Sequence, residues 1–154
     1  MPLLFQPKPR SIVICDFNGF IEPEIIKKRP VVVIAAHKRN SKLVTVVPLS
    51  TTAPNVVEAH HYRLKQNPLP GSSPSTVVWA KCDMLAVVSI ERLDQYRTAR
   101  GPDHRRQYLK IQIGPEQFDE IRRGVASALG LVSLFEPPQR GTGSPSGEDV
   151  GTLC

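Results

Sequence analysis

The sequence predicts a mainly β fold with one C-terminal helix (α+β), in which short antiparallel strands form a small barrel within a single domain. Short runs rich in Val, Ile and Thr recur along the first two thirds of the chain. Fifteen prolines, about twice the usual share, separate these runs. A helical spacing of apolar residues appears only after Pro115, and no helix of useful length fits before residue 114.

Six runs are typical of strands because each is short, β-branched and bounded by turn residues. They cover residues 11–17, 31–36, 42–47, 60–64, 76–81 and 85–90. Residues 107–113 alternate apolar and polar side chains and form a seventh candidate strand. Residues 66–75 hold three prolines, a glycine and several serines, which predicts a mobile loop.

One amphipathic helix is expected to pack across the curved sheet. Pro115 suits the first helical position, and Gly130 suits the C-terminal cap. Between them, apolar residues recur at the spacing of one helical face: Phe118, Ile121, Val125, Ala128 and Leu129.

The chain is long enough for one domain with a modest core. We expect an N-terminal extension over residues 1–10 and a folded domain over residues 11–135. Residues 136–154 are mostly Gly, Ser, Pro and acidic residues, so a disordered tail is expected there.

Composition restricts the classes of function. No apolar run reaches the ~20 residues of a membrane span, and the N-terminus lacks the features of a signal peptide, so a cytoplasmic protein is expected. The net charge of +6 favours polyanionic partners such as nucleic acid or an acidic protein segment.

No cofactor or metal is expected. Three cysteines stand far apart without CxxC spacing, which favours reduced thiols. Cys15 and Cys82 lie in apolar runs and are interpreted as small buried hydrophobes. His60 and His61 are adjacent, so on a strand they would face opposite sides and could not share an ion.

Three polar clusters interrupt the apolar strands. In the first, Glu24, Lys27, Lys28 and Arg29 precede Pro30 and a buried strand that can hold them in place. Cations beside a carboxylate suit a phosphodiester, which gains negative charge as it reacts. A solvated turn before a core strand is the alternative reading.

The other two clusters also allow two interpretations. Ser50, Thr51 and Thr52 follow directly after a strand and can bind a phosphate or cap a turn. Lys81 and Asp83 are two residues apart, so on an extended segment both would face the same way. That arrangement suits general acid–base catalysis, or forms only a surface ion pair.

Taken together and in order, these segments resemble the PemK/MazF family of type II toxin–antitoxin toxins. Residues 11–17 resemble the family's opening strand, which ends in Asp-Phe. Residues 29–33 resemble its Arg-Pro followed by an apolar strand, and residues 47–52 its Val-Pro-x-Thr/Ser-Thr segment. Residues 81–83 resemble its Arg-Cys-Asp or Ala-Asp motif. The similarity spans roughly residues 10 to 131, including the closing helix.

The resemblance implies a sequence-selective, metal-independent endoribonuclease on an SH3-like barrel that works as a homodimer. In the family, the substrate's own 2′-hydroxyl attacks the adjacent phosphate of single-stranded RNA. The products carry a 2′,3′-cyclic phosphate and a 5′-hydroxyl. A cognate acidic antitoxin is expected as a partner, and operator DNA through the toxin–antitoxin complex.

The resemblance also assigns roles to residues. Arg29 would stabilise transition-state charge, and Ser50 and Thr51 would hydrogen-bond the scissile phosphate. Asp83 matches the base of the PemK branch, whereas Glu24 matches an acidic residue important in the MazF branch, and both remain candidates. Lys81 stands where Arg is common, as an acid or a phosphate clamp. Substrate-binding roles are expected for Lys27, Lys28, Thr52 and Trp79.

Two alternative functions remain open. A related group of the same fold binds DNA gyrase without cutting RNA, and an inactive relative can act as a DNA-binding autorepressor with its antitoxin. Further candidate groups could have a functional or a purely structural role. Trp79 and Tyr62 can stack on bases or lie in the core. The arginine-rich segment around residues 97–106 can follow an RNA backbone or form a solvated loop.

Overall fold

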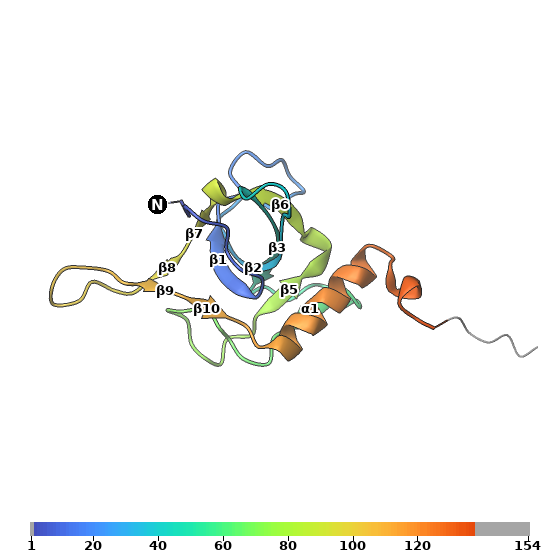
Figure 1. Cartoon of the computed structure of the whole chain (residues 1–154). Helices are drawn as coiled ribbons and strands as arrows, with labels where there is room; N and C mark the ends of the chain where they lie inside the picture. The colour runs from blue at the N-terminus through green and yellow to red at the C-terminus, as the bar shows by residue number, and fades with distance from the viewer. Residues whose placement is uncertain (1, 138–154) are drawn as a thin grey trace, which may run out of the picture.

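The structure is a computed structural model that describes residues 2–137. Short strands curl into a small barrel, and a single long helix lies against it (Figure 1). The elements are β1 (Ser11–Cys15), β2 (Arg29–Ala36), β3 (Leu43–Ser50), β4 (His61–Arg63), β5 (Trp79–Lys81), the 3-10 turn η1 (Cys82–Met84), β6 (Ala86–Ser89), η2 (Ile90–Arg92), β7 (Leu93–Asp94), β8 (Tyr96–Arg97), β9 (Tyr108–Leu109), β10 (Ile111–Gln112), α1 (Pro115–Ala128) and η3 (Val132–Leu134).

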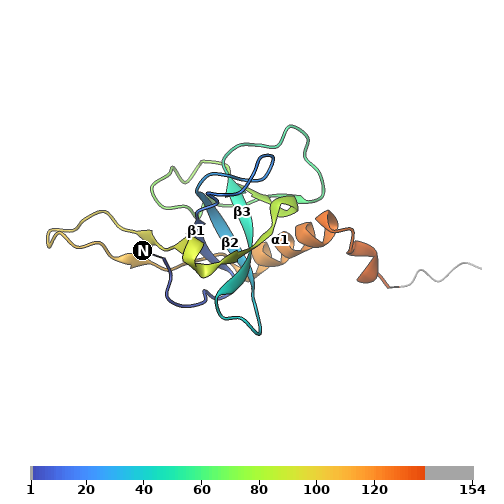
Figure 2. The same cartoon turned by 90° about the horizontal axis from the view of Figure 1, so that it is seen from above.

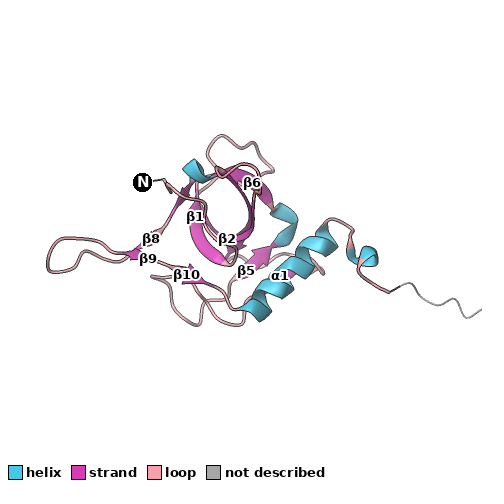
Figure 3. Cartoon of the chain, in the orientation of Figure 1, coloured by secondary structure: helices cyan, strands magenta, loops and turns pink. Residues whose placement is uncertain are grey.

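The main sheet is antiparallel throughout, in the order β10-β1-β2-β3-β5-β4. β3 also pairs with β6, and β1 also pairs with β7, so each of these two strands pairs with three others. The sheet curls into a barrel-like layer (Figure 3). This architecture confirms the predicted mainly β fold with one C-terminal helix.

The core has two parts, one on each side of the central strands. Val31, Val33, Val44 and Val46 pack on one side with residues of β1, β6 and β7. The intervening side chains, including Val32, pack on the other side against the helix. Both faces of β2 are therefore buried, which explains why its sequence is continuously apolar rather than alternating.

Helix α1 forms for the reasons that the sequence suggests. Gly114 precedes it in an extended conformation, and Pro115 takes the first position. Phe118 and Ile121 are buried in the core part that faces the helix. At the C-terminus the amide of Gly130, at φ +69°, bonds to Ser127 O and that of Leu131 bonds to Ala126 O, which is a Schellman cap.

Most predicted elements are present, with shifted boundaries. β2 and β3 are longer than expected and extend to Arg29 and Ser50, so two polar clusters belong to strand ends. The strand predicted over residues 107–113 is wrong as one element, because β9 pairs with β8 whereas β10 pairs with β1. The short strands β7 and β8 carry too few residues to give a periodic signal and were not predicted.

Two segments leave or join the barrel. The β8–β9 hairpin and its arginine-rich loop extend to one end of the molecule, and α1 lies at the other (Figure 2). At the N-terminus, Leu3 is buried in the core and its amide bonds to Leu93 O at 2.9 Å.

The tail predicted to be disordered lies almost entirely outside the described residues. Within residues 2–137, no helix has the length and apolar character to cross a bilayer.

Gly124 of α1 should not tolerate a side chain. A Cβ at this buried position would lie 2.7 Å from Cys82 Sγ and 3.3 Å from Cys82 Cβ. Gly124→Ala is therefore expected to destabilise the protein by about 1–3 kcal/mol, although Ala is the better helix former. Urea denaturation measures the change.

The Cys82→Ala/Gly124→Ala double variant is the matched control, because it removes the sulfur that the new methyl group meets. Its loss of stability should be smaller than the sum of the two single losses. Additive losses would contradict a clash between these two side chains.

Candidate functional site

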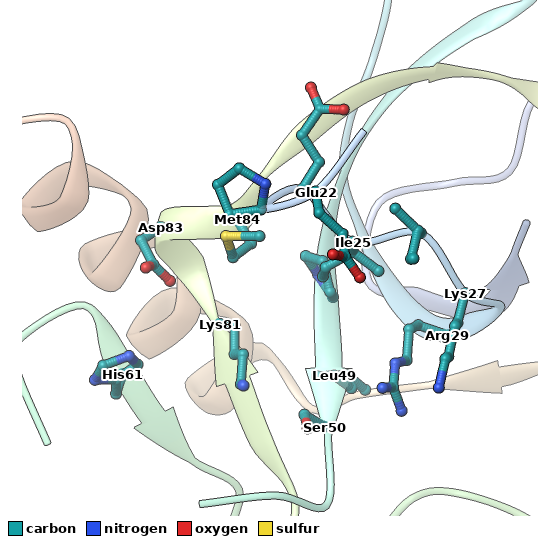
Figure 4. A pocket seen from close by; sticks show the side chains of 14 residues that line it. Glu22, Ile25, Lys27, Arg29, Leu49, Ser50, His61, Lys81, Asp83 and Met84 are labelled. Carbon is teal, nitrogen blue, oxygen red and sulfur yellow. The ribbon is translucent and has the colours of Figure 1, made fainter. Parts of the chain in front are cut away.

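One pocket, with a volume of about 400 Å³, brings together residues from all three polar clusters (Figure 4). It lies between the β1–β2 loop, the ends of β2 and β3, and the β5–η1 segment. The ionisable and hydroxyl side chains that line it are Glu22, Glu24, Lys27, Arg29, Ser50, His61, Lys81 and Asp83. Of the site residues predicted from the sequence, four do not line it: Lys28, Thr51, Thr52 and Trp79.

The strand register explains why these side chains meet. Val31 of β2 lies opposite Pro48 of β3, and continuing this antiparallel register by two residues brings Arg29 beside Ser50. On the next pair of strands, Lys81 of β5 lies opposite His61 of β4. Residues opposite each other in a ladder share a face of the sheet. In Figure 4, Lys81 lies between His61 and Ser50, with Arg29 beyond Ser50.

The β1–β2 loop, which supplies Glu22 to Lys27, is anchored to the barrel. Phe17 is buried and meets Phe20 edge to face with ring centroids 5.3 Å apart. Arg92 donates to Asp16 O at 3.0 Å and to Asn18 O at 2.7 Å, and its guanidinium lies 5.1 Å from the Phe20 ring centroid. The loop is therefore fixed to the barrel, and its residues form one wall of the pocket.

Asp83 reaches the pocket in an unexpected way. In place of the extended segment predicted for Lys81 and Asp83, residues 82–84 form the 3-10 turn η1. Both side chains still line the pocket, so the expected proximity holds although the reasoning behind it does not. Cys82, which is fully buried between them, holds the turn against helix α1 through Sγ, 3.4 Å from Ile121 O.

The hydroxyl cluster divides into two roles. Ser50 Oγ accepts a hydrogen bond from the Thr52 amide at 3.1 Å, so it caps the turn after β3. Its own O–H has no acceptor among residues 2–137 and can donate into the pocket. Thr51 and Thr52 are exposed outside the pocket. The turn interpretation and the phosphate interpretation of Ser50 are thus compatible.

The cationic side chains of the pocket have no hydrogen-bond or ion-pair partner among the described residues. Among residues 2–137, no hydrogen bond or ion pair engages the side chains of Lys27, Arg29 or Lys81. A guanidinium and two ammonium groups around one concavity can bind the oxygens of a phosphodiester.

The Glu24 carboxylate already binds a backbone amide. It accepts the Ile21 amide at 2.6 Å and so closes its own loop. Among residues 2–137, the one ion pair of Asp83 is with His60, whose Nε2 lies 3.6 Å from Asp83 Oδ2. Of the two candidate bases, Asp83 is the one not used in capping the backbone.

The two described cysteines have no place in this chemistry. Cys15 and Cys82 are fully buried, and burial raises the pKa of each thiol to about 12. Tyr62 packs beside the core, and burial, with a smaller effect of Glu120 and Glu116, raises its pKa. The interpretation of both cysteines as small hydrophobes is confirmed, and Tyr62 belongs to the core rather than to a base-stacking surface.

One inference from the sequence is wrong. His60 precedes strand β4, which begins at His61, so the two side chains do not alternate as on a strand. Their ring centroids lie 4.2 Å apart, and both rings lie beside Asp83. Sequence reasoning also missed Arg92, which holds the β1–β2 loop at one wall of the pocket, because an isolated Arg carries no motif signal.

Comparisons with known proteins agree with this fold. The family model for the PemK-like, MazF-like toxin of type II toxin–antitoxin systems matches residues 8–129. The uncharacterized Escherichia coli (strain K12) protein YifN is 31% identical over 155 residues, covering 88% of this chain and 99% of YifN.

Solved structures show the same fold at low sequence identity. An endoribonuclease in complex with its cognate antitoxin, from Mycobacterial species, has a TM-score of 0.54 at 20% identity, over 81% of this chain and 96% of that one. MazF from Deinococcus radiodurans has a TM-score of 0.55 at 18% identity, over 80% and 96%. The family match covers most of the barrel and its helix, so this chain belongs to the family of PemK-like, MazF-like toxins of type II toxin–antitoxin systems.

Proposed function

We propose that this protein is a metal-independent endoribonuclease that cleaves single-stranded RNA. The observation that carries the proposal is the convergence of Arg29, Lys81 and Ser50, all with free donors, in one pocket that Asp83 also lines. The similarity to structures described as endoribonucleases adds to it.

The proposed reaction is an attack of the ribose 2′-oxygen on the adjacent phosphorus. The bond from phosphorus to the 5′-oxygen breaks, which leaves a 2′,3′-cyclic phosphate and a 5′-hydroxyl. A base must take the 2′-OH proton, and an acid must return a proton to the departing 5′-oxygen. Arg29 and the Ser50 hydroxyl would stabilise the phosphorane, whose charge exceeds that of the substrate. Lys81 would act as the acid or as a second cation on the phosphate.

Asp83 is the better base in this proposal. Its carboxylate is partly exposed at the pocket and is not used by any backbone amide among residues 2–137. Glu24 already accepts the Ile21 amide, so moving it to a ribose would open its own loop. Lys27 would add charge along the substrate, whereas the exposed Lys28, Thr51 and Thr52 and the half-buried Trp79 would serve only RNA outside the pocket.

The proposed setting is a cytoplasmic toxin–antitoxin pair. One related structure is described as an endoribonuclease with its cognate antitoxin, which supports an antitoxin partner for this chain. A homodimer is proposed on the family resemblance alone. Contact with DNA through the antitoxin is likewise proposed on the family resemblance alone.

The central prediction concerns Arg29. The purified protein should cut single-stranded RNA in the presence of EDTA and leave ends that polynucleotide kinase labels without prior phosphatase treatment. Arg29→Ala should lower the cleavage rate by roughly 100- to 1,000-fold, because the phosphorane loses its guanidinium.

Lys28→Ala is the matched control, since Lys28 is the neighbouring cation but lies outside the pocket. It should reduce cleavage by less than about tenfold, a loss of long-range charge only. A wild-type protein that cuts no RNA but inhibits DNA gyrase would replace this proposal with the binding-module alternative.

The choice of base has its own test. Asp83→Asn should lower the cleavage rate by roughly 100-fold or more, because the amide cannot accept the 2′-OH proton. Glu24→Gln should keep most of the activity. Circular dichroism and thermal melting check that both variants are folded, and the opposite ranking of the two rates would assign the base to Glu24.

Ser50 and Thr51 give a pair of adjacent hydroxyls with different surroundings. Ser50→Ala should reduce cleavage by about 10- to 100-fold as a phosphate donor is lost, whereas Thr51→Ala should remain near the wild-type rate. Initial rates on one labelled RNA measure both. Equal losses would mean that the turn moves on substrate binding.

A further inference from the structure

His60, His61 and Asp83 form a cluster beside the pocket that the proposed reaction uses only in part. One ligand-type atom from each residue lies within 4.8 Å of the other two. His60 Nε2 and Asp83 Oδ2 are 3.6 Å apart. Two ligands of a tetrahedral Zn²⁺ with bonds of about 2.1 Å lie about 3.4 Å apart, so this pair is already close to ligand spacing.

The second ring nitrogen of His60 supports the same interpretation. His60 Nδ1 lies 3.4 Å from Glu58 Oε2, so a carboxylate stands behind the imidazole whose Nε2 faces Asp83. A carboxylate on the outer nitrogen fixes the tautomer and raises the basicity of a metal-binding histidine. The ring is also largely buried, with 19% of its side chain exposed, and this restricts its orientation.

The backbone holds the cluster together. The Cys82 amide donates to His60 O at 3.3 Å, which ties the residue before β4 to the turn that carries Asp83. The His60 and His61 ring centroids are 4.2 Å apart. His60 and Asp83 are therefore held at ligand spacing before any ion binds, and the His61 ring lies beside that of His60.

His61 needs one adjustment. Its Nδ1 accepts the Glu58 amide at 3.1 Å, so in the neutral ring the proton sits on Nε2. Turning the ring by half a turn about its Cβ–Cγ bond replaces Nδ1 by a carbon and frees a nitrogen for the ion. Only a single solvent-exposed hydrogen bond is lost.

We propose that His60, His61 and Asp83 bind a divalent transition metal of the Zn²⁺ class. Two imidazoles and one carboxylate favour Zn²⁺, Co²⁺ or Ni²⁺ over Mg²⁺, which prefers oxygen ligands and water. The ion would bind the Asp83 carboxylate, which would then no longer be free to accept a proton. If Asp83 is the base of the proposed nuclease, Zn²⁺ is an inhibitor of a reaction that needs no metal.

Metal binding is measured first, without RNA, so that its result does not depend on the nuclease proposal. The full chain, free of any affinity tag, carries Cys154→Ser to remove a thiol outside the described residues. Isothermal titration with Zn²⁺ should show one saturable site per chain. Co²⁺ should give a visible spectrum of nitrogen and oxygen ligation, and Mg²⁺ should not compete.

The variants locate the site. His60→Ala and Asp83→Asn should each weaken Zn²⁺ binding by more than about tenfold, and Glu58→Gln by roughly tenfold through loss of the outer carboxylate. His37→Ala and His104→Ala are matched controls and should leave the affinity unchanged. Absence of saturable binding, or equal affinity in the wild type and His60→Ala, overturns the proposal.

The regulatory consequence is tested on RNA and rests on the proposed function. Zn²⁺ should inhibit cleavage at the concentration that half-fills the site, and EDTA should restore the rate. If Zn²⁺ fills the site without slowing cleavage, the metal site is supported but Asp83 is not the base, because cleavage then does not need a free Asp83 carboxylate. A protein that binds zinc and cuts no RNA would leave the metal site standing and remove the nuclease proposal.

Discussion

The antiparallel register of β2, β3 and β5 is the constraint on which the site depends. Val31 lies opposite Pro48, and Leu49 lies opposite Ala80, so the three strands are paired with fixed offsets. A slip of one residue would turn Arg29 or Ser50 to the opposite face. Val31 to Val33 are all fully buried, on alternating sides, so the strand that begins at Arg29 is fixed in the core. The continuous apolar run after Arg29 thus supports the site as much as the core.

The second wall of the pocket depends on contacts outside the strands. Phe17 anchors the β1–β2 loop in the core, and Arg92 from η2 binds two of its carbonyl groups. The Asp-Phe pair that follows the first strand therefore fixes the position of the β1–β2 loop. It starts the loop whose far end carries Lys27 and Arg29.

Sequence reasoning predicted the fold class, the helix and the three polar clusters, because each depends on local patterns. It did not predict which members of a cluster enter the pocket. Ser50 and Thr51 have the same chemistry, and only the end of β3 and its turn separate them. The assumption of an extended chain failed at His60 and at residues 82–84, where a turn and a 3-10 helix replace alternation. Such short irregular segments carry no periodicity from which to infer the direction of a side chain.

Helix α1 connects the core to the chemistry through Cys82 and Gly124. Glycine at residue 124 leaves room for the Cys82 side chain, whose sulfur also approaches Ile121 O. With Cys82 fixed inward, Lys81 and Asp83 on either side of it remain at the pocket, and the Cys82 amide holds His60 beside Asp83. The small size of Gly124 thereby helps to set the position of the Asp83 carboxylate. Because cleavage and zinc binding would both need that carboxylate, the packing of α1 would govern both, and zinc binding would exclude catalysis without any change of fold.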